Sequence, residues 1–219
     1  MSYTASACTQ AATPRIFCIG RNYAEHIAEL GHSQARTCVV FMKPLSALVA
    51  AGTDIPIPSG QGSVHHELEL VVEIGTGGRN IRAAHAADHI AGIGLGLDLT
   101  LRTLQNELKS TGEPWEKCKS FDYSAPLAPL RRFDAAIDLD ALEFQLDVNG
   151  EPRQRGNTRM MLVDIPGLIA QLSAHWQLLA GDLIYTGTPQ GVGAIEPGDT
   201  LTVSSEHLPT AQWRVTAAS

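Results

Sequence analysis

Short apolar runs recur along the whole chain and predict a fold with many strands. Glu67–Ile74 alternates strictly between polar and apolar positions, which is typical of a strand. Ala91–Thr100 is a glycine-rich apolar run that we also interpret as a strand. Asn149-Gly150 suits a type I′ turn, so it predicts a hairpin between Phe144–Val148 and Glu151–Gln154. Further short strands are expected at Ile16–Ile19, Cys38–Met42, Leu183–Thr186 and Leu201–Val203.

Helical spacing is confined to a few segments. We expect short helices at Tyr23–Leu30, Ile81–Asp88 and Leu101–Lys109, and a longer one within Ile165–Leu179. Strands therefore outnumber helices, and regular strand–helix–strand units are scarce. This pattern favours a mixed α/β, β-rich fold, in which a rolled β core carries peripheral short helices, over a doubly wound parallel sheet.

The composition is that of a globular protein. The chain has 219 residues, of which 44% are hydrophobic and 18% are charged. One domain of this length buries about 70% of the surface that its unfolded chain exposes. No internal repeat and no linker rich in Pro, Gly or Ser divides the sequence. We therefore expect an N-terminal arm at residues 1–14 and a single domain at residues 15–219.

The charge balance excludes two classes of partner. Lys and Arg total 16 against 23 Asp and Glu, so the formal net charge is −7. A chain without a basic block is a poor match for nucleic acid or for an anionic membrane surface. The longest apolar stretch, Ile90–Leu99, is too short to cross a bilayer, and the N-terminus lacks a secretory pattern. Four cysteines without CxxC spacing indicate reduced thiols, so we expect a cytoplasmic protein.

Three acidic residues are candidates for a metal site. Glu67 and Glu69 share one face of the expected strand, with Cα atoms about 6.5–7 Å apart. Such a pair is either a solvated strand face or a pair held by a cation. Asp98 ends the glycine-rich apolar run, where a simple surface residue is not expected. Three carboxylates form a hard oxygen site, which suits Mg²⁺, Mn²⁺ or Ca²⁺ better than Zn²⁺.

Three further clusters carry possible chemistry. His26 and Glu29 are three residues apart on an expected helix, so the carboxylate can orient the imidazole as a base; an ordinary solvated pair is the alternative. Lys119 can stabilise a carboxylate or a developing enolate, or it is a surface lysine. The loop within Asp182–Gly193 contains three glycines, and it is either an anion-binding loop with a Thr hydroxyl or a plain tight turn.

The order of these elements resembles the fumarylacetoacetate hydrolase family, in its short acylpyruvate hydrolase-like branch. The resemblance spans roughly residues 15–205 and implies a mixed β-sandwich roll with peripheral short helices, usually assembled as a homodimer. The matching segments are GRNYAEHIAELGH from Gly20, FMKP from Phe41, SVHHELEL from Ser63, GLGLDLTLR from Gly94, PWEKCKSFD from Pro114, QRGNTRMM from Gln154 and GDLIYTGTPQGVG from Gly181.

The resemblance also implies a role for each matching residue. Glu67, Glu69 and Asp98 correspond to the carboxylates that bind a divalent metal, with Mg²⁺ expected first and Mn²⁺ or Ca²⁺ as alternatives. His26 and Glu29 correspond to a water-activating dyad, and Lys119 to the lysine beside the substrate. Ser120 departs from the small Gly or Ala expected there. The positions that contact the substrate carboxylate or support the metal site are Arg21, Lys43, Arg102, Gln105 and Thr188.

The activity implied by the resemblance is hydrolysis of a carbon–carbon bond. An acylpyruvate, such as fumarylpyruvate or acetylpyruvate, would yield pyruvate and a carboxylic acid, a step of aromatic compound catabolism. The same metal–enolate chemistry leaves oxaloacetate decarboxylase, keto–enol tautomerase and isomerase as alternatives, all acting on a small 2-oxo acid. A metal-dependent binding protein without turnover is a further alternative, against which His26, Glu29 and Lys119 argue.

Overall fold

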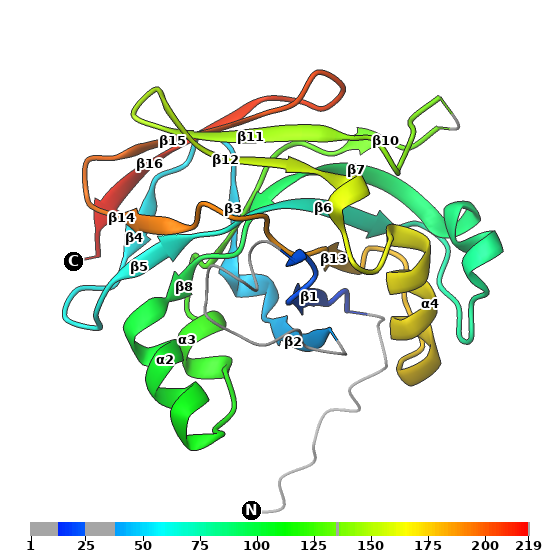
Figure 1. Ribbon diagram of the computed structural model, residues 1–219, viewed down its shortest axis with the longest axis horizontal. Coiled ribbons are helices and arrows are strands. Elements are labelled where there is room, and N and C mark those ends of the chain that lie inside the picture. Colours follow the sequence, from blue (N-terminus) through cyan, green and yellow to red (C-terminus); the bar gives the residue numbers. More distant parts are fainter. Residues whose placement is uncertain (1–12, 25–37, 135, 219) are drawn as a thin grey trace, which may run out of the picture.

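The chain folds into three β-sheets with short helices around them (Figure 1). The computed structural model describes residues 13–24, 38–134 and 136–218. The expected arm at residues 1–14 lies almost wholly outside the described residues, as does most of the expected helix at 23–30. The strand-rich mixed fold predicted from the sequence is confirmed, including the curled sheets typical of this architecture.

The largest sheet has eight strands and holds the middle of the molecule. Its order is β2 (Val39–Lys43), β1 (Ile16–Gly20), β13 (Leu183–Tyr185), β6 (Leu68–Ile74), β7 (Ile90–Leu97), β9 (Ala125–Leu127) and β3 (Leu48–Ala50), with β10 (Arg131–Arg132) paired to β7. The five-stranded sheet has the order β12 (Glu151–Asn157), β11 (Glu143–Val148), β15 (Thr200–Ser204), β16 (Ala211–Ala217) and β4 (Ile55–Ile57). The smallest sheet joins β14 (Gly193–Ile195), β5 (Val64–His66) and β8 (Thr100–Leu101).

Strand β6 is buried on both of its faces. Leu70 and Val72 belong to the larger hydrophobic cluster, together with Phe144 of the five-stranded sheet. Val71 points the other way and belongs to a smaller cluster with Tyr185. Of the two alternatives for the face that carries Glu67 and Glu69, the solvated strand face is therefore excluded, because the sheet is covered on both sides.

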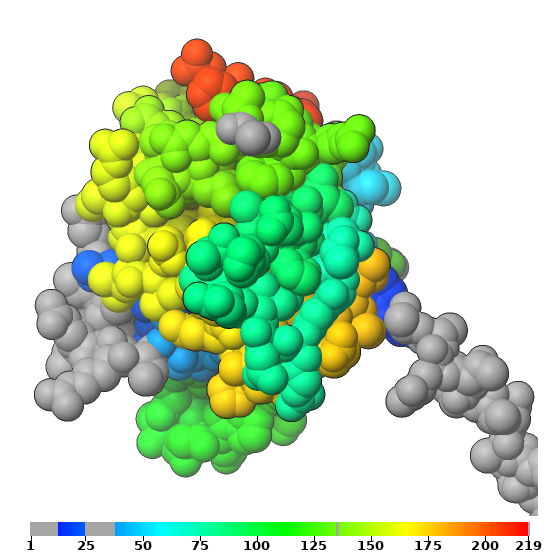
Figure 2. All heavy atoms as spheres, turned by 90° about the vertical axis from the view of Figure 1, so that its right-hand side faces the viewer, coloured from blue at the N-terminus to red at the C-terminus, as the bar shows by residue number. Residues whose placement is uncertain are grey.

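The helices lie at the edges of the sheets. The elements that lie wholly within the described residues are the 3₁₀ turns η1 (Leu45–Ala47), η2 (Ala83–His89) and η3 (Thr158–Met160), and the α-helices α2 (Arg102–Thr111), α3 (Glu116–Lys119) and α4 (Ile165–His175). The segment expected as a helix at Ile81–Asp88 forms η2, since its first turn closes with a tight bond from His85 N–H to the Arg82 carbonyl. Figure 2 shows this segment beside α4, where Ile81 N–H donates to Ser173 Oγ (2.9 Å).

Three connections cross between the eight-stranded and the three-stranded sheet at one place, which we call the seam. The seam consists of Glu67 between β5 and β6, residues 98–99 between β7 and β8, and residues 186–192 between β13 and β14. Asp98 N–H donates to the Glu67 carbonyl (2.8 Å), and Thr186 N–H donates to the Leu70 carbonyl (3.1 Å). The run Ala91–Thr100, expected as one strand, is therefore divided at Asp98.

The hairpin predicted at Asn149-Gly150 is confirmed. Both residues have a left-handed backbone, with φ of 55° and 82°, as a type I′ turn requires. Three of the four cysteines, Cys18, Cys38 and Cys118, lie in the described part of the chain and are free thiols, as predicted. Within these residues no helix combines the length and the apolar character that a membrane span requires.

One glycine of β7 makes room for an aromatic ring. A Cβ atom at Gly96 would lie 2.7 Å from Cε1 of Tyr185 and 2.8 Å from Cγ2 of Val71. Tyr185 is fully buried, and its hydroxyl donates to the Pro126 carbonyl (3.2 Å). The absence of a side chain at Gly96 therefore leaves room on β7 for the ring of Tyr185, which comes from β13.

We expect Gly96→Ala to lower the free energy of unfolding by about 1–3 kcal/mol, because neither the ring nor the backbone has room to move. Gly20→Ala is the matched control on β1, since a Cβ atom there meets nothing closer than 3.6 Å. Urea unfolding of the two variants measures the difference. Equal stability of both variants would contradict the packing argument.

Candidate active site

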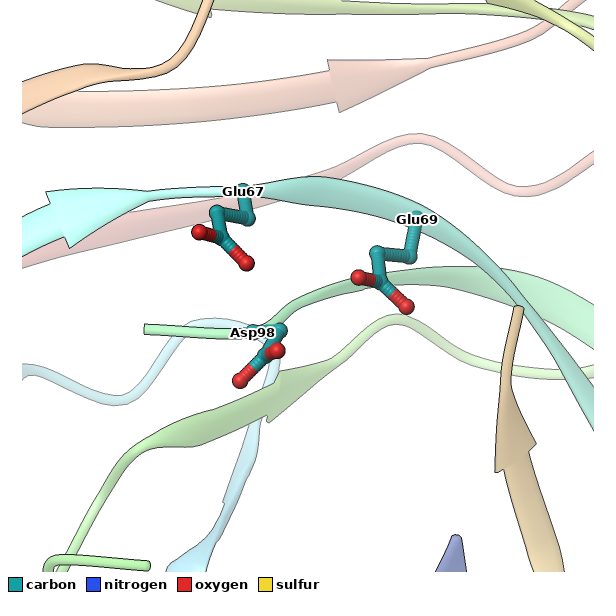
Figure 3. Close-up of side chains that lie close together, drawn as sticks. All are labelled: Glu67, Glu69 and Asp98. Carbon is teal, nitrogen blue, oxygen red and sulfur yellow. The ribbon is translucent and has the colours of Figure 1, made fainter. Parts of the chain in front are cut away.

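Three buried carboxylates converge at the seam and form what we call the carboxylate triad: Glu67, Glu69 and Asp98. Figure 3 shows the three side chains close together, with Glu67 and Glu69 on one stretch of chain and Asp98 just after the neighbouring strand β7. Ligand oxygens of all three lie within 4.8 Å of one another, and the residues are 5%, 1% and 1% exposed. The solvated strand face is therefore excluded, and the three residues predicted as metal ligands are brought together.

Lys119 is held directly against the triad. Its Nζ lies 2.7 Å from Glu67 Oε2, 2.6 Å from Asp98 Oδ2 and 2.6 Å from Thr100 Oγ1. Burial alone would lower the pKa of Lys119, but the carboxylates of Asp98 and Glu67 outweigh it and raise the pKa above its ordinary value. Lys119 is thus a protonated, buried ammonium group, and the surface-lysine alternative is excluded.

Two more cationic side chains, those of Lys43 and Arg102, form ion pairs with carboxylates of the triad. Lys43 Nζ forms an ion pair with Asp98 Oδ1 (2.8 Å) and donates to the carbonyls of Leu99 and Lys119. Arg102, at the start of α2, donates to Glu67 Oε1 and to the side chain of Gln105. Lys43 and Arg102 therefore contact the triad directly, and Gln105 contacts Arg102. Support of the metal site is one of the two roles that the resemblance implied for these positions.

Glu69 differs from the other two members of the triad. Its Oε2 accepts a hydrogen bond from Gly187 N–H (2.8 Å), but no cationic side chain among the described residues lies within ion-pair distance. Burial, followed by the negative charges of Asp98 and Glu67, raises the pKa of Glu69 well above its ordinary value. An added divalent cation would relieve this charge directly.

The donor set fits a hard divalent cation. Three carboxylates with oxygens directed toward one point are the ligands that Mg²⁺, Mn²⁺ and Ca²⁺ prefer. Neither neighbouring histidine joins the group, which among the described residues consists of carboxylates alone, and His66 is paired with Gln154. The zinc alternative therefore gains no nitrogen ligand from the described residues.

Positive charge extends outward from the triad. Lys109 lies two turns of α2 beyond Arg102, with its Nζ 5.3 Å from the centre of the Trp115 ring. Its partial burial and the charge of Arg102, with smaller contributions from Lys119 and Arg21, lower its pKa to about 8. Lys109 therefore adds positive charge on the side of the site where Arg102 lies.

The other predicted site residues are divided between described and undescribed parts of the chain. Arg21 is half-buried with a left-handed backbone (φ 65°), and its Nε is buried without a partner among the described residues. Thr188 is buried in the loop after β13. His26 and Glu29, predicted as the dyad, lie outside the described residues.

The sequence did not predict the part that several residues play in supporting the site. Asn22 binds the backbone of Val163 in both directions and donates to the Thr186 carbonyl (2.9 Å), so it ties the end of β1 to the seam. Gln154 reaches the seam from β12. A lone Asn or Gln carries no local signal of such distant partners. Ser120 uses its hydroxyl to cap the Met42 carbonyl (2.6 Å), which accounts for a small polar residue there.

Fold and site together define a strand-rich enzyme with a buried three-carboxylate site for a divalent cation. A model of the family described as "Fumarylacetoacetate (FAA) hydrolase C-terminal" matches residues 15–216. The chain therefore belongs to the fumarylacetoacetate hydrolase family, and the resemblance inferred from the motifs is confirmed.

Individual relatives carry different activities in their names. The oxaloacetate tautomerase YcgM of Escherichia coli is 46% identical over 193 residues, which is 87% of each chain. A mitochondrial oxaloacetate decarboxylase of Dictyostelium discoideum is 39% identical over 197 residues, 90% of each chain. The crystal structure of fumarylpyruvate hydrolase from Pseudomonas aeruginosa, in complex with Mn²⁺ and pyruvate, has a TM-score of 0.88 at 37% identity and covers 94% of this chain and 91% of that chain.

We expect Mn²⁺ or Mg²⁺ to raise the melting temperature of the protein, because a ligand that binds only the folded state stabilises it. Glu69→Gln should abolish this rise while keeping the bond from Gly187 N–H. Glu73→Gln, on the same strand but half-exposed, is the matched control and should keep the rise. A metal-dependent rise that persists in Glu69→Gln would contradict the proposed ligand set.

The raised pKa of Glu69 predicts that metal binding releases protons. Without a cation the carboxyl holds its proton to a higher pH than an ordinary Glu, so the metal must displace that proton. Metal affinity should therefore rise with pH until the raised pKa is passed, and then level off. Calorimetric titration in two buffers of different ionisation enthalpy measures the protons released; an affinity independent of pH between about pH 5 and pH 8 would contradict the shift.

Proposed function

We propose that this protein interconverts the keto and enol forms of oxaloacetate with the help of a divalent metal ion, Mg²⁺ first. The observation that carries the proposal is the protonated Lys119 ammonium fixed between Glu67 and Asp98. The name of the E. coli relative, an oxaloacetate tautomerase, supports the same reaction. A homodimeric assembly and a cytoplasmic location remain predictions.

The reaction moves one proton and leaves the formula of the substrate unchanged. A base removes a proton from C3, and the 2-oxo oxygen gains one to form the enol. A bound divalent ion supplies Lewis-acid polarisation of the 2-oxo group. Negative charge gathers on that oxygen as the C3 proton leaves, so a preorganised ammonium group beside it stabilises the transition state.

Residues of this chain divide the remaining tasks. Lys119 supplies positive charge next to the enolate oxygen, and its hydrogen bonds to Glu67, Asp98 and Thr100 keep the ammonium in place. Arg21 and Lys109 supply positive charge toward the anionic substrate. His26, oriented by Glu29, is the base that we assign from the sequence.

Acylpyruvate hydrolysis is the second candidate, since the fumarylpyruvate hydrolase of P. aeruginosa has the same fold. It requires a base that activates water, for which His26 and Glu29 are again the candidates. Decarboxylation of oxaloacetate would use the same enolate and needs no water. The three reactions therefore differ in the bond that breaks rather than in the site that stabilises the charge.

A substrate comparison separates the candidates. With Mg²⁺ or Mn²⁺ present, enol absorbance follows oxaloacetate tautomerisation, and a coupled assay follows pyruvate released from oxaloacetate, acetylpyruvate or fumarylpyruvate. We expect the highest kcat/KM for tautomerisation. A higher kcat/KM for pyruvate release from an acylpyruvate would replace the proposal by the hydrolase, and one for pyruvate release from oxaloacetate would replace it by the decarboxylase.

We expect Lys119→Met to reduce oxaloacetate tautomerisation by about 10²–10³-fold, the usual effect of removing one group that stabilises a developing oxyanion. Lys117→Met is the matched control, because Lys117 lies on the same short helix but is exposed. Circular dichroism and the metal-dependent melting temperature verify that both variants fold. Equal rates for the two variants would exclude Lys119 as the stabilising cation.

A further inference from the structure

The side chain of Gln154 joins the five-stranded sheet to the seam. Gln154 lies on β12 and is 1% exposed. Its Oε1 accepts from Leu68 N–H (2.9 Å) and lies 2.8 Å from His66 Nδ1. Its Nε2 donates to Thr188 Oγ1 (2.9 Å) and to the Pro189 carbonyl (3.0 Å). An amide side chain can accept two hydrogen bonds and donate two, so Gln154 makes every hydrogen bond available to it.

The partners determine which way the amide faces. Leu68 N–H can only donate and the Pro189 carbonyl can only accept, so a flipped amide would place like groups against each other at both ends. With Oε1 toward Leu68, the nearby His66 Nδ1 must carry a hydrogen. With Nε2 toward the loop, Thr188 Oγ1 must act as an acceptor.

The Thr188 hydroxyl therefore keeps its own hydrogen for another acceptor. Among the described contacts this hydrogen reaches only the Pro189 carbonyl, 3.5 Å from Oγ1, in a bond at the limit of hydrogen bonding that a nearer acceptor can replace. Thr188 is only 4% exposed, so bulk water does not readily accept a hydrogen bond from its hydroxyl. The preceding residue, Gly187, donates its N–H to Glu69 (2.8 Å), so Thr188 follows in the chain a residue that contacts the carboxylate triad directly.

We propose that Gln154 is a positioning residue: by donating to Thr188 Oγ1, it leaves the Thr188 hydroxyl hydrogen to a carboxylate oxygen of a 2-oxo acid bound at the triad. The inference rests on the proposed function for the chemical class of the ligand. Gln154 would not touch the ligand itself. Its effect on the ligand comes from fixing the direction in which the buried Thr188 hydroxyl donates its hydrogen.

A double-mutant cycle on ligand binding tests this role. Oxalate, an analogue of the pyruvate enolate, is titrated calorimetrically into the Mn²⁺-loaded protein, into Gln154→Glu, into Thr188→Val and into the double variant. An ionised carboxylate at position 154 can only accept, so it turns the hydroxyl hydrogen away from the ligand. We expect Gln154→Glu and Thr188→Val each to weaken oxalate binding by about tenfold or more, and the double variant to be no weaker than Thr188→Val.

The pH dependence gives a second signature. As the pH falls, the introduced carboxyl takes up a proton and can again donate to Thr188, so the loss caused by Gln154→Glu should shrink. Thr188→Val should remove this pH dependence. Gln212→Glu is the matched control, because Gln212 also donates to a threonine hydroxyl, that of Thr202 (3.1 Å), but on the surface; it should bind oxalate as the wild type does.

Three results would overturn the inference: losses that add in the double variant, a loss unchanged by pH, or an unaffected Gln154→Glu. If the cycle shows coupling between Gln154 and Thr188 but the protein does not interconvert the keto and enol forms of oxaloacetate, the proposed function alone is overturned. A wild-type protein that does not bind oxalate would overturn both. If Gln154→Glu fails to fold, long-range ¹H–¹⁵N spectra of the metal-free wild type decide: hydrogen on His66 Nδ1 supports the amide orientation, and hydrogen on Nε2 alone refutes it.

Discussion

The burial of three carboxylates in one small space is the constraint on which the rest of the site depends. Isolated charges are costly in a protein interior, and removing one partner of a buried pair is more damaging than never burying the pair. Lys43, Lys119 and Arg102 meet this requirement, and they come from β2, α3 and α2 respectively. Elements at the periphery of the fold are thereby bound to its centre by charge.

The negative charges of the three carboxylates are not neutralised to the same extent, and this difference matters for the chemistry of the site. Glu67 and Asp98 are each paired with two of these cations, whereas Glu69 depends on a backbone N–H. The triad therefore keeps one carboxylate whose charge only a further cation can satisfy. The cationic side chains of Lys43, Lys119 and Arg102 lie around the other two carboxylates, so the charge of the triad is balanced everywhere except at Glu69.

The sequence predicted what depends on local pattern. Alternation located the strands, Asn149-Gly150 located a hairpin, and the motif order indicated the family. It did not predict that Glu67 and Asp98 lie where strands change sheets, because periodicity records which face a side chain occupies and not which sheet its strand joins. The partners of Gln154 are 34 to 88 residues away in the chain, so no local pattern points to them.

The seam also sets an order of events during synthesis. Residues 67, 69 and 98 leave the ribosome long before Gly187, whose N–H completes the environment of Glu69. Pairings this distant form late, because the chain must close long loops before they stabilise it. The environment of Glu69 is therefore complete only in a chain that has been synthesised beyond residue 187.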